Sequence, residues 1–188
     1  IINFAQGEFV MIGGMAATSL VALGLPLPVA MALAVAIAAV VGLLLEKLAI
    51  ERASRAAVTT LIIITIGASM LLRGVAQIVW GKGIRSLPPL SGDRPIGFGG
   101  ATVLPQSLWV LGTMLAVVVA LSWFFGRTRL GRAMLATAHN RFAAQLVGID
   151  VRLVLFASFG LAAALGAIAG VLIAPIGFTS YDAGVMLG

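Results

Sequence analysis

The stretch Leu27–Leu45 reads LPVAMALAVAIAAVVGLLL, nineteen consecutive residues without a charge. An α-helix rises about 1.5 Å per residue, so this stretch is long enough to cross the roughly 30 Å of hydrocarbon in a bilayer. The whole chain has the same character, since 61% of its 188 residues are hydrophobic and 10% are charged. A soluble domain carries about 25% charged residues. The sequence therefore predicts an all-α, polytopic helical membrane protein.

Four further apolar stretches accompany this one. Proline lacks the amide donor that a helix interior needs, so Gly24–Pro28 separates the first span from the second. Gly81–Pro105 is rich in glycine and proline and predicts an irregular segment outside the membrane, with room for a short hairpin. Phe9–Leu23 is an uncharged stretch of only fifteen residues, so the first span must also draw on residues 1–8 or on sequence outside this chain. The five predicted spans are about 1–23, 27–45, 56–80, 106–126 and 153–178.

The distribution of basic residues predicts how the chain is oriented. Three Lys or Arg residues lie in 46–55 and five in 127–152, against three in 81–105. Because basic loops stay on the cytoplasmic side, segment 127–152 is predicted to be a cytoplasmic loop and 81–105 an outer segment. The net charge of +6 comes from basic residues that lie mostly in these loops, where such residues set orientation. No basic run is interleaved with aromatic residues, so nucleic-acid binding is not predicted.

The sequence contains no group of residues typical of an enzyme or a metal site. It has no cysteine, a single histidine (His139), and six acidic residues scattered over loops and predicted span ends. Neither a Gly-x-Ser-x-Gly elbow nor a phosphate-binding glycine loop is present. The sequence therefore predicts no catalytic residue, no metal and no cofactor. It also predicts no acidic residue in the middle of a span, where a proton relay would need one.

Polar residues gather directly before the first apolar helix, in the segment NFAQGE, residues 3–8. Its candidate pathway residues are Asn3, Gln6 and Glu8. Two interpretations stay open. The segment is either an interfacial loop that enters an ordinary span, or the polar start of a broken helix that faces a wet cavity, as occurs in transporters.

A polar stripe runs along the third predicted span. Its members recur every four residues and so share one helical face; they are Thr65, Ser69, Arg73 and Gln77. For Thr65 and Ser69, lining of a pathway and hydrogen bonding between helices are both open. Arg73 lies about five turns into the span and is predicted to snorkel toward the outer surface.

The fifth predicted span carries small residues at four-residue spacing. They are Ala162, Gly166, Gly170 and Ala174. Small side chains in register let two helices approach closely in lipid. We therefore expect this face to pack against another helix of a bundle.

Residues 131–148 combine apolar and polar positions in a helical pattern. Leu135, Phe142 and Leu146 fall in one narrow arc, with Arg132 at its edge, which predicts one short amphipathic helix. Such a helix lies either in the lipid headgroups or in the groove of a partner protein. Gly148 is predicted to end it in a left-handed cap.

The sequence resembles the membrane permease subunits of ATP-binding-cassette importers for branched-chain amino acids. The stretches that carry the resemblance are Ile2–Phe9, Glu51–Arg55, Thr65–Gly67, Trp80–Gly81, and Gly131–Ala133 through Ala143–Ile149. Within the last of these, Ala143, Ala144 and Gly148 resemble the end of the loop by which such permeases engage their ATPase. Phe142 stands where the family has Glu, and Gln6 where it often has His.

The resemblance implies a pore-forming subunit in the cell membrane of a prokaryote. Its partners would be a second, similar permease, two cytoplasmic ATP-binding subunits that hydrolyse ATP, an external solute-binding protein, and membrane lipid. The cargo would be a small polar solute such as a branched-chain amino acid; urea, short amides and other amino acids are alternatives. Family members have helices before and after this region, so we expect residues 1–188 to be one permease domain truncated at both ends. An ion-coupled secondary transporter or channel is the alternative function.

Overall fold

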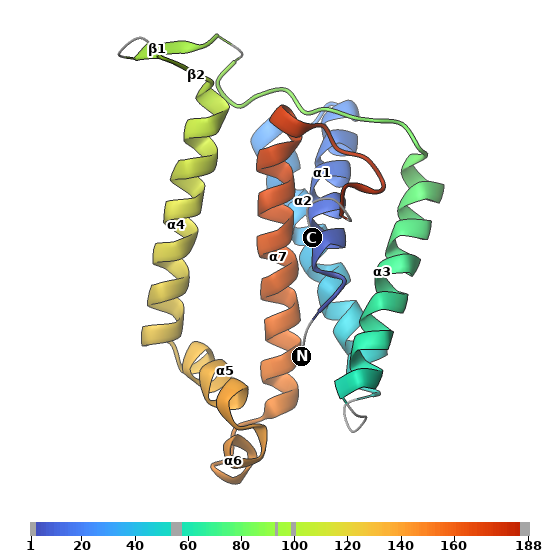
Figure 1. The fold of residues 1–188 in the computed structure, drawn as a ribbon, viewed down its shortest axis with the longest axis vertical. Coiled ribbons are helices and arrows are strands. Elements are labelled where there is room, and N and C mark those ends of the chain that lie inside the picture. The colour runs from blue at the N-terminus through green and yellow to red at the C-terminus, as the bar shows by residue number, and fades with distance from the viewer. Residues whose placement is uncertain (1–2, 54–57, 93, 99–100, 185–188) are drawn as a thin grey trace.

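The computed structural model describes residues 3–53, 58–92, 94–98 and 101–184, and Figure 1 shows their arrangement. Residues 54–57, at the start of the predicted 56–80 span, lie outside the described residues. The elements in chain order are α1 (Gln6–Ala22), α2 (Leu27–Leu45), the π-helical turn η1 (Glu46–Ile50), α3 (Val58–Trp80), β1 (Ile96–Phe98), β2 (Ala101–Val103), α4 (Pro105–Arg127), α5 (Arg129–His139), α6 (Arg141–Leu146) and α7 (Val151–Gly177).

The predicted helical membrane class is confirmed. Among the described residues, four helices are long and apolar enough to cross a bilayer; they are Leu27–Ile50, Thr59–Trp80, Pro105–Arg127 and Val151–Gly177. Helix α1 has 17 residues and at about 1.5 Å per residue is shorter than the hydrocarbon layer. Segment 81–105 contains the expected hairpin, in which β1 pairs antiparallel with β2.

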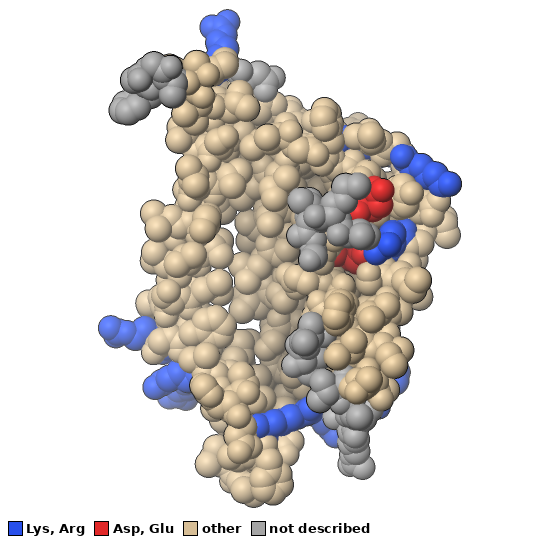
Figure 2. Space-filling model, viewed as in Figure 1, with Lys and Arg blue, Asp and Glu red and all other residues tan. Residues whose placement is uncertain are grey.

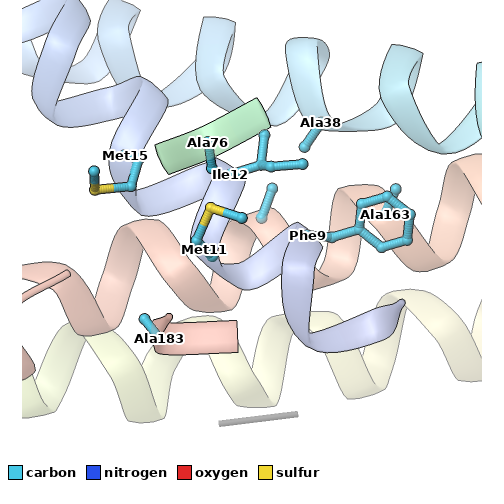
Figure 3. Packing of buried hydrophobic residues seen from close by; sticks show 9 residues of the cluster. Phe9, Met11, Ile12, Met15, Ala38, Ala76, Ala163 and Ala183 are labelled. Carbon is cyan, nitrogen blue, oxygen red and sulfur yellow. The ribbon is translucent and has the colours of Figure 1, made fainter. Parts of the chain in front are cut away.

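Helix α7 is the central helix of the bundle. It packs most extensively on α1 and α2, while α3 and α4 stand on opposite flanks (Figure 1). The buried core is built from α1, α2, α3 and α7, and Figure 3 shows α1 side chains such as Phe9 and Met11 gathered among small alanines. Alanine facing alanine lets the helix axes approach, so close packing stabilises these contacts more than bulky apolar side chains do.

The small-residue stripe of α7 faces α1. A β-carbon on Gly166 would lie 3.0 Å from the β-carbon of Phe9, and one on Gly170 would fall on the carbonyl oxygen of Val10. Ala174 is buried on the same helix, and Ala162 offers its backbone carbonyl to Gln6. The backbones of α1 and α7 therefore approach to a distance that leaves no room for a side chain at Gly170.

The chain after α7 turns back into the bundle. Phe178 has a φ of +55°, which reverses the chain direction directly after the helix. Thr179 then forms a two-way backbone pair with Arg85, with N···O distances of 2.8 and 2.7 Å. The returning segment, residues 178–184, descends between α1 and α3 (Figure 1). We call it the return segment.

The prediction of one amphipathic helix over residues 131–148 is wrong. Asn140 adopts an extended conformation, with φ −152° and ψ 102°, and divides the region into α5 and α6. Its side-chain oxygen accepts the Ala143 N–H at 3.0 Å and so caps the start of α6. The capping bond satisfies a free N–H at the start of α6, which makes a break at asparagine favourable.

Candidate functional site

Helix α1 begins in the middle of the bundle. The Gln6 side-chain amide donates to the carbonyl of Ala162 at 3.0 Å, and Ala162 is the twelfth of the 27 residues of α7. Glu8 contacts Ser69, the twelfth of the 23 residues of α3. The first turn of α1 therefore lies at half the height of its neighbours. This geometry fits the broken-helix interpretation and not the interfacial loop.

Glu8 is the centre of a buried charged network. Its side chain is 2% exposed, and its Oε1 accepts hydrogen bonds from Ser69 Oγ at 2.8 Å and from Arg73 Nη2 at 2.9 Å. A single charge at bilayer depth costs at least about 2.5–3.5 kcal/mol unless it is paired or reaches water. Here two opposite charges meet, so each reduces the cost of the other.

Two expectations about this region are wrong. Arg73 does not snorkel outward, because its guanidinium turns inward to Glu8 and its side chain is only 33% exposed. The six acids are not confined to span ends and loops, since Glu8 lies at mid-height; Glu46, at the start of η1, is also buried. Arg73 turns inward because its partner Glu8, 65 residues away in the sequence, lies beside it in the fold.

The remaining polar residues join the same site. Thr65, which is fully buried, accepts the Phe4 N–H at 3.4 Å, and Asn3 accepts the Ala5 N–H at 3.1 Å. Together with the Glu8 contacts, these bonds join the non-helical start of α1 to the polar stripe of α3. The structure therefore brings Asn3, Glu8, Thr65 and Ser69 together and adds Arg73. Gln6, in the same first turn of α1, faces α7 instead.

Hydrogen-bonding capacity at this site is incompletely used. Among the described residues, three buried side-chain atoms have no partner: Asn3 Nδ2, Glu8 Oε2 and Arg73 Nε. Glu8 Oε2 faces Gly184 of the return segment, where a β-carbon would lie 2.7 Å from it. A buried polar atom without a partner is unfavourable, so water or a polar solute would be stabilised here. A carboxylate, a guanidinium, a hydroxyl and amides offer both charges and both hydrogen-bonding roles.

The second predicted site, at the α5–α6 end, projects beyond the ends of α4 and α7 (Figure 1). Phe142 is 70% exposed, and Arg132, Leu135, Ala143 and Leu146 are also exposed. Ala144 is buried. Leu135 lies on α5 and the other apolar side chains on α6, so they do not share the single helical arc that was expected. The sequence interpretation omitted Val147, which is 76% exposed beside Leu146.

Gly148 ends α6 as expected, with a φ of +86°. The Ile149 N–H donates to the Ala144 carbonyl and the Gly148 N–H to the Gln145 carbonyl, both at 3.0 Å. This pair of bonds is the Schellman arrangement, which favours glycine at the left-handed position. The exposed tip is thus held by hydrogen bonds at both ends of α6, at Asn140 and at Gly148.

No metal-binding group is visible in the described ranges: no cluster of three or more His, Cys, Asp or Glu side chains forms there. The ion pairs of those residues are Arg73–Glu8 and the exposed Arg152–Glu51 contact at 4.0 Å.

Comparison with known proteins gives a consistent result. The family model described as the permease component of a branched-chain amino acid transport system matches residues 1–188. The high-affinity branched-chain amino acid transport system permease protein LivH of Escherichia coli K12 is 31% identical, with 92% of this chain and 60% of LivH covered. BraD of Pseudomonas aeruginosa, with the same description, is 29% identical at the same coverage.

A more distant relative is described by a different cargo. The ribose import permease protein RbsC of Haemophilus influenzae is 26% identical, with 92% of this chain and 52% of RbsC covered. No solved structure matches the chain. The chain thus spans 60% of the length of the LivH and BraD relatives.

Proposed function

We propose that this chain, which belongs to the family of branched-chain amino acid transport permeases, forms part of the membrane pathway of an ATP-driven importer. The cargo would be a small polar solute, in the first place a branched-chain amino acid, because the relatives LivH and BraD carry that description. ATP hydrolysis belongs to a separate partner subunit in this proposal, and the chain itself is not an enzyme.

The observation that carries the proposal is the polar start of α1 at mid-height. A helix that begins inside the membrane leaves its first N–H groups and its polar side chains where a solute would cross. Asn3, Gln6, Glu8, Thr65 and Ser69 then contribute to the pathway, with Arg73 beside Glu8. Non-helical backbone at this depth is tolerated where it is buried or lines a wet cavity.

The α5–α6 tip is proposed to contact the ATP-binding subunits. Exposed apolar side chains at the end of a helix pair, Phe142 above all, suit insertion into a groove of another protein. The full assembly would contain a second permease, two ATP-binding subunits and an external solute-binding protein in a lipid membrane. Nothing in the described residues suggests a nucleic-acid partner.

The orientation of the chain follows from this proposal. The α5–α6 tip would face the cytoplasm and segment 81–105 the outside, in agreement with the basic-residue bias. A cysteine placed at Gln145 should be shielded from an impermeant thiol reagent in intact cells, while one at Ser91 should react. Both positions are exposed in the structure. Labelling at Gln145 from outside would reverse the proposed orientation.

The buried position of Glu8 also bears on the alternative of an ion-coupled transporter. A buried acid in the middle of a span would favour such a transporter, and Glu8 lies at that height. However, its Oε1 already accepts hydrogen bonds from Ser69 and Arg73, so this pairing joins α1 to α3 in the core of the bundle. Family membership and this pairing both favour the importer.

A reconstitution experiment separates the two functions. The full-length permease would be purified with its ATP-binding subunits and second permease, placed in proteoliposomes, and supplied with its solute-binding protein and labelled leucine. Uptake should require ATP and the solute-binding protein, and it should persist when ionophores collapse the ion gradients. Uptake that ignores ATP and stops with ionophores would establish the ion-coupled alternative. Parallel assays with urea, a short amide and ribose would identify the cargo class.

A further inference from the structure

The hairpin end of the bundle contains a cavity that is separate from the Glu8 site. Its volume is about 580 Å³, within the range of about 300–1,000 Å³ typical of small-molecule sites. Three segments line it: the residues after α3, the last turns of α7, and the return segment. In the view of Figure 2, most of the visible surface carries no charge, and the few acidic atoms lie near basic ones on one flank.

The cavity wall carries one positive and one negative side chain. Lys82 follows α3, and Asp182 lies in the return segment, where it accepts a hydrogen bond from Ser180. Within the described ranges, neither charge forms an ion pair with the other or with a third residue. Two opposite charges that share a cavity without meeting leave space for a ligand that bears both.

The rest of the wall is mainly apolar. Ile84, Ile173 and Phe178 line the cavity beside the two charges, and Ser180 and Tyr181 add hydroxyl groups. A sugar offers no charge for Lys82 or Asp182 to bind, and a dicarboxylate would need a second cation. An α-amino acid with an aliphatic side chain has the matching set: a carboxylate, an ammonium group and an apolar side chain.

The cavity is held in shape by contacts outside its lining. The backbone pair between Arg85 and Thr179 joins the segment after α3 to the return segment. The Arg85 side chain also donates to Ser19 Oγ of α1 at 3.3 Å and to the Trp80 carbonyl at 3.4 Å. A cavity whose walls are fixed in advance loses less conformational entropy when a ligand binds.

The cavity adjoins the site in the middle of the bundle. Ala183 lines the cavity and packs in the same core cluster as Phe9 and Met11 of α1. The next residue, Gly184, lies against Glu8 Oε2. The return segment therefore lines the cavity on one side and contacts the Glu8 site on the other. Only this segment separates a solute held in the cavity from Glu8.

We propose that this cavity binds the zwitterion of an aliphatic α-amino acid before it enters the pathway. Lys82 binds the carboxylate, Asp182 binds the ammonium group, and the apolar wall contacts the side chain. This inference rests on the proposed transport function and adds a site to it. An ion pair at an exposed position contributes little, so loss of one charge should weaken binding by at most about fivefold.

The test uses three ligands with one carbon skeleton. Leucine has both charges, leucinamide lacks the carboxylate, and 4-methylpentanoate lacks the ammonium group. Saturation-transfer NMR on the complete transporter in nanodiscs, without the solute-binding protein, measures the three affinities. The wild type should prefer leucine over each analogue by about three- to fivefold.

The variants should then remove these preferences separately. Lys82→Gln should abolish the preference over leucinamide and keep that over 4-methylpentanoate, while Asp182→Asn should do the reverse. Lys82→Arg should behave as the wild type. Lys47→Gln is the matched control, because Lys47 is exposed on the segment after α2 and does not line this cavity.

Two results would overturn the proposal: equal binding of all three ligands by the wild type, or equal weakening of all three by Lys82→Gln and Asp182→Asn. The second would assign the charges to fold stability or to docking of the external protein. Leucine uptake by the same preparation reports on the proposed function independently. Uptake without any ligand preference would remove the cavity proposal alone, and preference without uptake would remove the proposed transport function alone.

Discussion

Replacing Arg73 with methionine should destabilise the protein more than replacing Glu8 with glutamine, although both changes break the same ion pair. The Glu8 side chain is 2% exposed, whereas that of Arg73 is 33% exposed. Arg73→Met therefore leaves a buried carboxylate charge with Ser69 as its only remaining partner among the described side chains. Glu8→Gln removes the buried charge and keeps an oxygen that accepts from both partners.

The exposed fractions of Glu8 and Arg73 determine how much stability each variant should lose. Removing one partner of a buried pair costs about 3–5 kcal/mol, and we take the low end, about 3 kcal/mol, because solvent partly screens Arg73. Glu8→Gln exchanges charge-assisted bonds for neutral ones, at a cost of about 1 kcal/mol. For a chain of this size, 1 kcal/mol moves the Tm by about 2–4 °C. The expected losses are therefore about 6–12 °C for Arg73→Met and about 2–4 °C for Glu8→Gln.

The assay is thermal unfolding of the purified permease in detergent, followed by fluorescence-detected size exclusion. Arg94→Met is the matched control, because Arg94 is exposed in the segment between α3 and β1 and should tolerate the change. The double variant Glu8→Met/Arg73→Met removes both charges and should be more stable than Arg73→Met alone. Equal Tm values for Arg73→Met and Arg94→Met, or a double variant less stable than Arg73→Met, would refute the buried pair.

Two further changes test the tip and the packing. Phe142→Ala should weaken recovery of the ATP-binding subunits with the permease by about 30-fold, equivalent to about 2 kcal/mol for an apolar anchor; Leu111→Ala, exposed on α4, should leave recovery unchanged. An unchanged ratio of co-purified subunits for Phe142→Ala would exclude the tip as an anchor. Gly170→Ala should lower stability by about 1–3 kcal/mol, because its β-carbon would meet the Val10 carbonyl, whereas Gly67→Ala has free space and should be neutral or slightly stabilising. Equal melting temperatures for these two variants would show that α1 and α7 can separate without loss.

Local patterns in the sequence predicted most helix limits correctly. The stretch 27–45 and helix α2 coincide, and α4 and α7 begin and end within two residues of their predicted limits. These limits depend on the length of an apolar run and on proline or polar residues at its ends. Both are local properties, because a helix in lipid must satisfy its own backbone hydrogen bonds.

The break between α5 and α6 also has a local signal in the sequence. Asn140 lies between two helical patterns, and asparagine is a favoured N-cap residue. A single helical arc through Leu135 and Phe142 does not allow for this break. The cap bond from the Ala143 N–H to Asn140 spans only three residues of sequence. The positive φ at Gly148 was predicted from the same kind of local chemistry.

The sequence by itself determined that this chain is a helical membrane protein, where α2, α4 and α7 begin and end, and which family it resembles. Only the tertiary structure decided that α1 begins at mid-height, and that Arg73 turns inward to Glu8. The physical reason is the range of the interactions. Span length and capping act within a few residues of sequence. The depth of α1 depends on its packing against Gly166 and Gly170 of α7, which lie more than 150 residues away. A charged residue in a span has two favourable solutions, water at the surface or a partner inside, and only the packed bundle brings the Glu8 carboxylate within 2.9 Å of Arg73.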